Sequence, residues 1–463
     1  MNHIINAQKE FFLTNTTKKI AFRIKQLKKL KQILQENEPL LYKAIQADFK
    51  KSEFETYTSE IGLLYAEIEE ACKKTKKWAR YKRVKTNRLN IPSKSFIVPE
   101  PLGVCLVIGA WNYPYLLSLA PVVAAIAAGN TIILKPSELP IQTSNVIAKL
   151  INRNFDASFF KVIEGGIPET TALLKCKFDK IFFTGSVAVG KIVHLAAAKN
   201  MTPVTLELGG KSPVIITENC HLKIIIKRLI WAKFLNAGQT CIAPDYVYIH
   251  ESLQKTFLKQ AKTAIIESNY SFKNENYVQI INTKNFNRLI ALIDKNKVVI
   301  GGDYDEKTRY ISPTIVSDVT FEDTIMQEEI FGPILPILTY RNLEDVIAKI
   351  KSKPKPLACY LATNSKKIKR KILNEISFGS GAINDSVMQI TNNNLPFGGV
   401  GESGMGSYHG EFGFKTFSHY KSIIDKKTWI EPNLKYHPYS NKKLRIIKIL
   451  QNGIGKFKRK KET

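Results

Sequence analysis

The chain has 463 residues, of which 44% are hydrophobic, and its 69 lysines and arginines outnumber its 40 aspartates and glutamates to give a net charge of +29. This length exceeds the size at which one hydrophobic core stops growing, so we expect at least two lobes, and the apolar content excludes a small binding module or a wholly disordered protein. The lysines are spread along the chain and are not gathered around aromatic residues, which argues against a nucleic-acid partner.

The cysteines and the apolar segments narrow the class of protein further. The six cysteines are scattered, with no CxxC pair and no His/Cys ligand spacing, which argues against structural zinc and against a disulfide framework. No apolar segment with a cleavage site opens the chain, and the longest apolar passage, residues 115–128, is too short to span a bilayer. We therefore predict a cytoplasmic protein without a metal site.

The predicted elements begin with helices and continue as alternating strands and helices. Apolar residues at helical spacing predict an amphipathic helix at residues 18–34, and more helix follows to about Trp78. The proline-bearing residues 84–101 are expected to be extended or to form a loop. From Gly103 onward, strands are predicted at residues 104–108, 131–134 and 180–183, and helices at residues 116–128, 142–151 and 189–198. A second set begins near Val204 and includes residues 214–216, 222–234, 247–249, 257–266, 289–293, 298–300, 334–338, 346–350 and 382–383. This alternation predicts parallel, doubly wound sheets.

The carboxyl-terminal residues 442–463 have a different composition. Lysines and arginines alternate there with Leu444, Ile447, Leu450, Ile454 and Phe457. One interpretation is a helix that lies on an anionic bilayer, and the other is a solvated, disordered tail, because Gly453 and Gly455 interrupt a helix and the apolar stripe is short.

Two segments carry candidate reactive side chains. Gly238-Gln239-Thr240-Cys241 places a thiol between a predicted helix and a predicted strand, where it can meet a substrate, although a lone cysteine is more often inert and buried. Glu207 precedes Gly209 and Gly210, so its carboxylate can act as a base where backbone approaches a ligand, or can merely cap a helix.

A third segment is a candidate phosphate site. Phe183-Thr184-Gly185-Ser186, followed by Gly190, ends a predicted strand and opens a predicted helix. The free N–H groups and positive dipole end of that helix suit a pyrophosphate. The spacing is not GxGxxG, and a glycine turn before a helix is often only a turn.

Taken together, these segments resemble the aldehyde dehydrogenase superfamily. The matching motifs, in order, are Trp111-Asn112-Tyr113-Pro114, Lys135-Pro136-Ser137-Glu138, Phe183-Thr184-Gly185-Ser186, Glu207-Leu208-Gly209-Gly210-Lys211, Gly238-Gln239-Thr240-Cys241 and Glu329-Ile330-Phe331-Gly332-Pro333. The resemblance extends to about Tyr420, and the closing segments, residues 396–399 and 404–410, resemble the class 3, fatty-aldehyde branch.

The resemblance implies an α/β fold with two Rossmann-like, doubly wound lobes and a small bridging β segment for oligomerisation. The implied NAD(P)-binding domain is residues 1–83 and 102–206, and the implied catalytic domain is residues 207–395. Residues 84–101 and 410–430 would bridge the subunits of a homodimer, and residues 431–463 would form the basic tail.

The resemblance also implies a role for each site residue. Cys241 would attack the aldehyde and form a thioester, the Asn112 amide and the Cys241 backbone N–H would hold the oxyanion, and Glu207 would activate water for hydrolysis. The implied cofactor residues are Lys135 and Glu138 at the adenosine ribose, Gly185, Ser186 and Gly190 around the pyrophosphate, and Glu329 and Phe331 at the nicotinamide. The charge of Glu138 favours NAD, and nearby Lys135 keeps NADP as an alternative.

Other interpretations stay open at this point. A CoA-acylating dehydrogenase would pass the thioester to a thiol without a carboxylate base, and Glu207 argues against it. A non-catalytic binding or scaffold protein would leave the presence of Asn112, Glu207 and Cys241 unexplained. Four aromatic residues either line a funnel for an aliphatic aldehyde of medium or long chain or pack in the core, and they are Tyr113, Tyr115, Phe397 and Tyr408.

Overall fold

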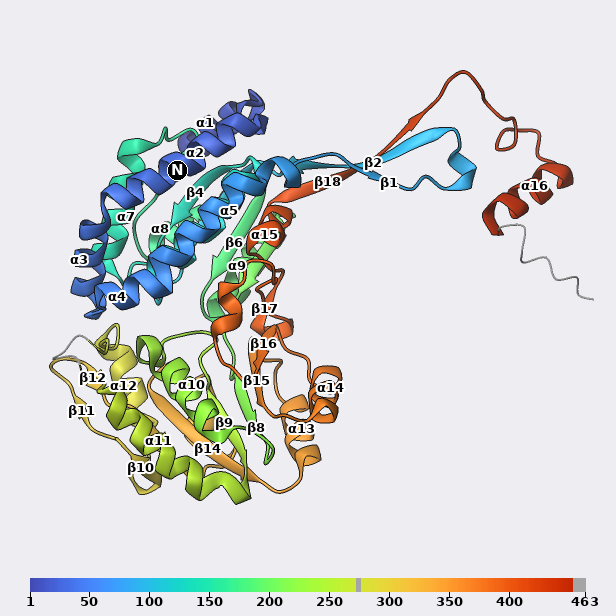
Figure 1. The fold of residues 1–463 in the computed structure, drawn as a ribbon. Helices are drawn as coiled ribbons and strands as arrows, with labels where there is room; N and C mark the ends of the chain where they lie inside the picture. The colour runs from blue at the N-terminus through green and yellow to red at the C-terminus, as the bar shows by residue number, and fades with distance from the viewer. Residues whose placement is uncertain (272–275, 453–463) are drawn as a thin grey trace, which may run out of the picture. The chain divides into compact units, whose positions relative to one another are not determined.

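The computed structural model describes residues 1–271 and 276–452, which form two compact units. The larger unit contains residues 1–75 and 101–417, and the smaller unit contains residues 76–100 and, within the described chain, 418–452. The larger unit is built on two mainly parallel sheets covered by helices (Figure 1), which confirms the predicted α/β class.

The first sheet of the larger unit has the strand order β17-β7-β6-β3-β4-β5, and all neighbours are parallel except β17 and β7. Its strands are β3 (Val104–Ile108), β4 (Thr131–Lys135), β5 (Phe160–Val162), β6 (Lys180–Thr184), β7 (Val204–Glu207) and β17 (Gly404–Met405). The strands β3, β4 and β6 are buried along their whole length. Helices cover both faces of such a sheet, which is why these strands have continuous apolar sequences.

Helices from the amino-terminal half and one late helix accompany this sheet. They are α1 (Asn2–Leu13), α2 (Ile20–Glu36), α3 (Glu38–Phe49), α4 (Glu53–Thr56), α5 (Gly62–Trp78), α6 (Pro114–Ala128), α7 (Ile141–Asn154), α8 (Ile167–Leu174), α9 (Val187–Ala198) and α15 (Gly410–Thr416). The predicted helix at residues 18–34 corresponds to α2, but α1 precedes it. The sequence analysis also missed β5 and α8, which are short.

The packing of α2 against the end of α6 requires glycine at position 129. Gly129 has a φ of +97° and its N–H donates to the Ala125 and Ile126 carbonyls, so it ends α6 in the left-handed region. A Cβ there would lie 2.6 Å from the Arg23 guanidinium. Arg23 is buried and donates to the Ala127 carbonyl at 3.0 Å, and it thereby fixes α2 to α6.

The second sheet has the strand order β10-β13-β14-β9-β8-β15-β16, with β10 antiparallel to β13. Its strands are β8 (Pro213–Ile216), β9 (Tyr246–His250), β10 (Val298–Ile300), β13 (Thr314–Val316), β14 (Ile334–Tyr340), β15 (Ala358–Ala362) and β16 (Ser380–Ile383). The associated helices are α10 (Leu222–Phe234), α11 (Gln254–Ser268), α12 (Thr283–Ala291), α13 (Leu343–Lys351) and α14 (Lys366–Glu375), and a separate hairpin pairs β11 (Tyr304–Asp305) with β12 (Tyr310–Ile311). The sequence analysis missed β15, although it is fully buried between β8 and β16.

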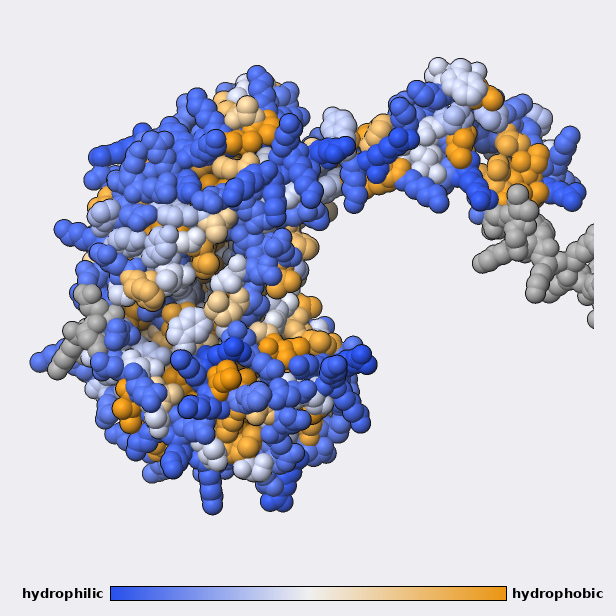
Figure 2. Space-filling view, in the orientation of Figure 1, coloured by the Kyte–Doolittle hydropathy of each residue, from blue (hydrophilic) through white to orange (hydrophobic). Residues whose placement is uncertain are grey.

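The smaller unit has a sheet of order β1-β2-β18, formed by β1 (Lys82–Val84), β2 (Ser93–Pro101) and β18 (Ser418–Lys426). β18 is exposed over most of its length, and Figure 2 shows apolar patches on this unit. The helix α16 (Asn441–Asn452) occupies the first part of the predicted basic tail. Ile454, Phe457 and the two glycines at 453 and 455 lie outside the described residues.

A helix that crosses a lipid bilayer needs about 20 predominantly apolar residues. Within residues 1–271 and 276–452, no helix combines the length and the apolar character that crossing a membrane demands.

Candidate active site

A cavity of about 570 Å³ lies at the carboxyl ends of β3, β4 and β6. The chain winds from β3 to β4 on one side and places β6 on the other side, so the strand order reverses here. Open α/β sheets bind ligands at this position. The residues that follow β3 and β6, among them Asn112, Gly185 and Ser186, line the cavity together with Cys241 from the second sheet's domain.

The cavity gathers all but one of the site residues that the sequence predicted. Those that line it are Asn112, Lys135, Glu138, Gly185, Ser186, Glu207, Cys241, Glu329 and Phe331. Gly190 is not among the lining residues. It lies in α9, where an added Cβ would be 2.6 Å from Leu208 Cδ2, so this glycine allows α9 to pack closely against Leu208.

The Asn112 amide is held against the loop that carries Cys241. Asn112 Nδ2 donates to the Gln239 carbonyl at 3.0 Å, and Asn236 Nδ2 donates to the Asn112 carbonyl at 2.9 Å. Tyr113 Oη and Thr240 Oγ1 share a hydrogen bond of 2.6 Å beside the thiol. An amide nitrogen has two hydrogens. Within the described residues, Asn112 therefore keeps one N–H for a ligand.

The Cys241 loop has an unusual backbone. After α10, Asn236, Ala237 and Gly238 have φ values of +53°, +50° and +71°. A Cβ on residue 238 would lie 2.3 Å from the Gly332 carbonyl oxygen, so only glycine fits. Non-glycine residues in the left-handed region store strain, which is common at functional sites.

Burial sets the protonation of the reactive groups. Neither carboxylate oxygen of Glu207 has a hydrogen-bond partner in the described part of the chain, and burial raises the pKa of Glu207 well above its ordinary value. Burial, with the charges of Glu329 and Glu207, raises the pKa of the Cys241 thiol to about 12. Burial and Asp245 raise the pKa of Glu329 to about 8. Burial therefore favours the neutral forms of the Cys241 thiol and of the Glu207 and Glu329 carboxyl groups.

The other end of the cavity has satisfied polar groups and fits a dinucleotide. Ser186 caps α9 by accepting from the Val189 N–H, and Gly185 N–H donates to the Glu207 carbonyl at 3.0 Å. The start of α9 thus offers free N–H groups to an anion. Lys135 Nζ donates to the Pro136 carbonyl at 2.7 Å and lies 3.4 Å from Glu138 Oε2, so an ammonium donor and a carboxylate acceptor lie side by side at the cavity.

The structure adds residues near the site to which the sequence analysis gave no role. Arg288 Nη2 donates to the Ile330 carbonyl at 2.6 Å and thereby supports the segment that carries Glu329 and Phe331. Trp111 stacks on Phe49 and meets the Phe331 ring edge-on at 5.3 Å. Arg288 is one basic residue among 69 in this sequence, so its charge alone carried no signal.

The four aromatic residues considered for a substrate funnel lie in the core. Tyr113, Tyr115, Phe397 and Tyr408 are buried and do not line the cavity. The structure therefore supports the core-packing interpretation for each.

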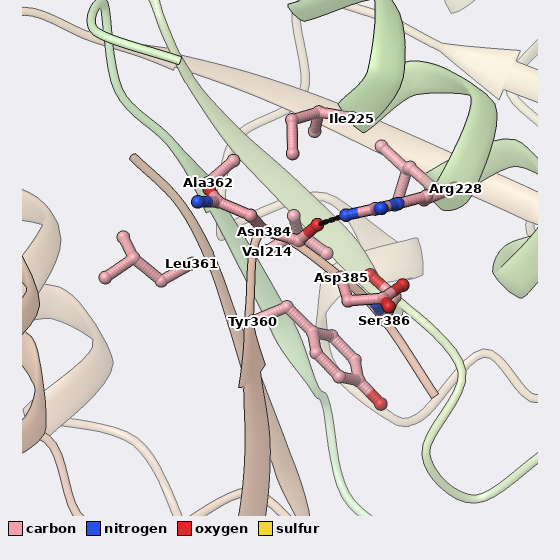
Figure 3. Close-up of a pocket in the computed structure, with 10 residues that line it drawn as sticks. Val214, Ile225, Arg228, Tyr360, Leu361, Ala362, Asn384, Asp385 and Ser386 are labelled. Atoms are coloured by element: carbon pink, nitrogen blue, oxygen red, sulfur yellow. Dashed lines mark hydrogen bonds between the residues drawn. The ribbon is translucent and has the colours of Figure 1, made fainter. Parts of the chain in front are cut away.

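A separate cavity beside β15 is too small to be the substrate site. It measures about 10 Å³, and Figure 3 shows Tyr360 and the Arg228–Asn384 hydrogen bond at its wall. This volume suits one water molecule. Tyr360 instead supports the reactive loop, because its hydroxyl donates to the Ile242 carbonyl at 2.6 Å.

The thiol, the amide and the carboxyl that line one cavity agree with the family comparison. Residues 1–423 match the sequence model of the aldehyde dehydrogenase family, so the chain belongs to that family. It falls in the class 3-like branch, and its activity is the NAD(P)-dependent oxidation of an aldehyde to an acid.

Two relatives and one solved structure illustrate the similarity. The chain is 47% identical over 442 residues to the 4,4'-diaponeurosporen-aldehyde dehydrogenase of Staphylococcus aureus, with 94% of this chain and 95% of the relative covered. It is 44% identical over 426 residues to the dimeric NADP-preferring aldehyde dehydrogenase of Mus musculus, with 92% and 94% covered. The structure of a substrate-bound Staphylococcus aureus AldH superposes with a TM-score of 0.95 at 45% identity and covers 97% of this chain and 99% of that chain.

Proposed function

We propose that the oxidation proceeds through a thioester on Cys241, with Asn112 as an oxyanion donor and Glu207 as the base for hydrolysis. The observation that carries this proposal is the convergence of the three side chains, from distant parts of the chain, on one cavity. Sulfur attacks the aldehyde carbon, and the oxygen becomes an oxyanion between the Asn112 N–H and the Cys241 backbone N–H. Both donors are neutral, so they stabilise the oxyanion without protonating it.

The buried surroundings of Cys241 and Glu207 determine when each of these two groups loses its proton. The cofactor, when bound, would accept the hydride that leaves the aldehyde carbon as the oxyanion collapses to the thioester, and it would also supply a positive charge. The thiol must lose its proton to become a nucleophile, and a nearby positive charge lowers its pKa. Glu207 is ready for hydrolysis once it has lost its own proton, and it then accepts one from the attacking water. No cation pairs with Glu207 in the described residues, which suits a group that must change its charge.

We further propose which residues hold the cofactor. Ser186 and Gly185 border the pyrophosphate at the start of α9, Lys135 and Glu138 bind the adenosine ribose, and Glu329 and Phe331 border the nicotinamide. Glu138 repels a 2′-phosphate, so we propose NAD as the preferred cofactor, with NADP also accepted because Lys135 lies beside it.

We propose an aliphatic aldehyde of medium or long chain as the substrate. The Trp111 and Phe331 rings at the cavity support an apolar substrate, as does the similarity to a relative named for diaponeurosporen-aldehyde. The test is NADH absorbance with a series of straight-chain aldehydes, with and without CoA. We expect kcat/KM to rise with chain length and a free acid to form without CoA. Acyl-CoA as the product would favour the CoA-acylating alternative, and no NADH formation would favour a scaffold.

We propose a cytoplasmic homodimer. The scattered cysteines, all unpaired, support the cytoplasm, and the exposed strand β18 and the similarity to a relative named as dimeric support the dimer, with β2 and β18 in its bridging sheet. Light scattering after gel filtration tests the dimer. We expect twice the mass of the chain, and a concentration-independent monomer would contradict it.

We also propose a peripheral contact between the basic tail and anionic membranes. The helix α16 exposes Leu444 and Ile449 and carries Lys442, Arg445 and Lys448. Such a helix binds anionic lipid through both its apolar and its basic side chains. Cosedimentation with phosphatidylglycerol vesicles, but not with phosphatidylcholine vesicles, is expected for the full chain. Unchanged binding after deletion of residues 442–463 would contradict the proposal.

A further inference from the structure

A small group of buried ionisable side chains lies outside the cavity and contacts both loops that carry Asn112 and Cys241. Lys51 and Glu60 form an ion pair of 2.9 Å with both side chains fully buried. Glu55 lies on the same helical stretch as Glu60 and is partly buried. None of these three side chains lines the cavity, so the mechanism above gives them no role.

Glu60 holds the loop of Asn112. Its Oε2 accepts the backbone N–H groups of Tyr115 at 2.9 Å and Leu116 at 3.4 Å, which are in the first turn of α6. No local side chain caps α6, and its first residue, Pro114, has no N–H. Glu60 therefore satisfies donors that a helix start leaves free, and its charge complements the positive end of the helix dipole. Asn112 stands directly before this turn.

Glu55 holds the loop of Cys241. Its Oε1 accepts the Asn236 backbone N–H at 2.9 Å, at the first of the residues with positive φ. The Asn236 side chain donates in turn to the Asn112 carbonyl at 2.9 Å and to the Gln239 carbonyl at 3.1 Å. One carboxylate thus fixes the residue that joins the two loops.

Lys51 contacts both Glu60 and Tyr113, which lies between the two loops. Besides its ion pair with Glu60, its Nζ lies 4.6 Å from the centre of the Tyr113 ring, and the Tyr113 hydroxyl bonds to Thr240 beside the thiol. An ammonium over an aromatic face is attracted to the ring. Lys51 therefore restrains Tyr113 between the two loops.

The helical segment that carries Glu55 and Glu60 contains a turn that brings the two side chains closer in direction. Residues five apart on an α-helix point about 140° away from one another. Tyr57–Ile61 form a π-helical turn between α4 and α5, whose extra residue reduces that angle. Such turns are rare and are frequent at functional sites. A fully buried ion pair gives little net stability, because desolvation opposes it, but it is sensitive to geometry.

We propose that Glu55 and Glu60, with Lys51, are positioning residues that set the distance between the Asn112 amide and the Cys241 sulfur. The inference rests on the proposed thioester mechanism. Since Asn112 acts only on the developing oxyanion, a shift of this amide slows attack on an aldehyde and leaves the thiol's intrinsic reactivity unchanged. The ratio of two rates on one thiol therefore reports on positioning.

The experiment compares Glu55→Ala with Glu53→Ala, a matched exposed glutamate on the same helix. The first rate is the single-turnover NADH burst with an aldehyde, and the second is iodoacetamide alkylation of Cys241, followed by mass spectrometry of its peptide. For Glu55→Ala we expect a burst slower by about 10–100-fold and alkylation within about 2-fold of the parent. Glu55→Gln retains an acceptor and should recover most of the burst.

Equal losses of both rates in Glu55→Ala, or a burst equal to that of Glu53→Ala, would overturn the proposal. Lys51→Met/Glu60→Gln gives a second test, because it leaves an oxygen for the Tyr115 N–H and no unpaired ammonium. Its burst should be faster than that of Glu60→Gln alone, and a burst that is no faster would count against the pair. If Cys241→Ala retains the burst, the thioester mechanism fails and the positioning proposal fails with it. If Cys241→Ala abolishes the burst but Glu55 is neutral, only positioning fails.

Discussion

The polar groups at the two ends of the cavity differ in whether they have hydrogen-bond or ion-pair partners. At the cofactor end, Ser186 caps a helix and Lys135 pairs with the partly exposed Glu138, so each group has a partner. At the chemical end, Glu207 is buried with no partner in the described residues, and Cys241 has a pKa of about 12. The proposed cofactor end thus gives its polar side chains partners, while the proposed catalytic end keeps a buried carboxyl without one, which costs free energy. Substitutions at the two ends should therefore have effects that differ in magnitude and in the property that they change.

The largest effect is expected at the thiol. Cys241→Ala removes the nucleophile and should lower kcat for aldehyde oxidation by at least about 10⁴-fold. Cys220→Ala is the control, because Cys220 is only partly buried and lies outside the cavity. Steady-state NADH formation measures both variants. Activity that survives in Cys241→Ala would exclude the thioester.

The next largest effect is expected at the oxyanion donor. Asn112→Ala removes one neutral donor and should lower kcat by about 10²–10³-fold, with a small change in the KM for NAD. Asn112→Asp should be no better, because a carboxylate repels the oxyanion. A change confined to the KM for NAD would place Asn112 at the cofactor end.

A smaller, pH-dependent effect is expected for stability at Glu207. Its pKa is raised in the folded chain, so the folded state keeps a proton that the unfolded state loses above about pH 4.5, and stability falls as pH rises from there towards the folded pKa. Glu207→Gln removes this loss. Its stability relative to the parent should increase by up to about 1.4 kcal/mol per pH unit.

Urea unfolding between pH 5 and pH 9 measures this difference. The exposed Glu164→Gln serves as the control and should follow the parent at every pH. A pH-independent difference for Glu207→Gln would mean that Glu207 is already ionised in the folded chain.

The smallest effect is expected at the cofactor end. Glu138 is 47% exposed in its side chain, so solvent weakens its repulsion of a 2′-phosphate. Glu138→Gln should therefore raise the NADP/NAD ratio of kcat/KM by only about 3–5-fold. Unchanged cofactor preference would remove Glu138 from the ribose site.

The sequence could predict the site residues that lie in short motifs, but not the contacts that support them. The motifs around Asn112, Glu207 and Cys241 are contiguous and pointed to the cavity before any fold was known. The supporting contacts, such as Glu55 with Asn236, join residues 181 apart and leave no local pattern. Long apolar strands such as β3 were predicted, whereas β15 was missed because Ala358-Cys359-Tyr360-Leu361-Ala362 follows a segment of lysines and prolines and has no alternation. The domain boundaries stay a prediction.

The most direct test of the thioester mechanism uses Glu207→Gln, which should form the acyl-enzyme but fail to hydrolyse it. Mixed with NAD and an aldehyde, this variant should release about one NADH per subunit and then stop, and mass spectrometry should find the acyl group on the peptide that contains Cys241. Sustained turnover at the parent's rate, or an acyl group on a different residue, would contradict the assignment of Cys241 as nucleophile and Glu207 as base.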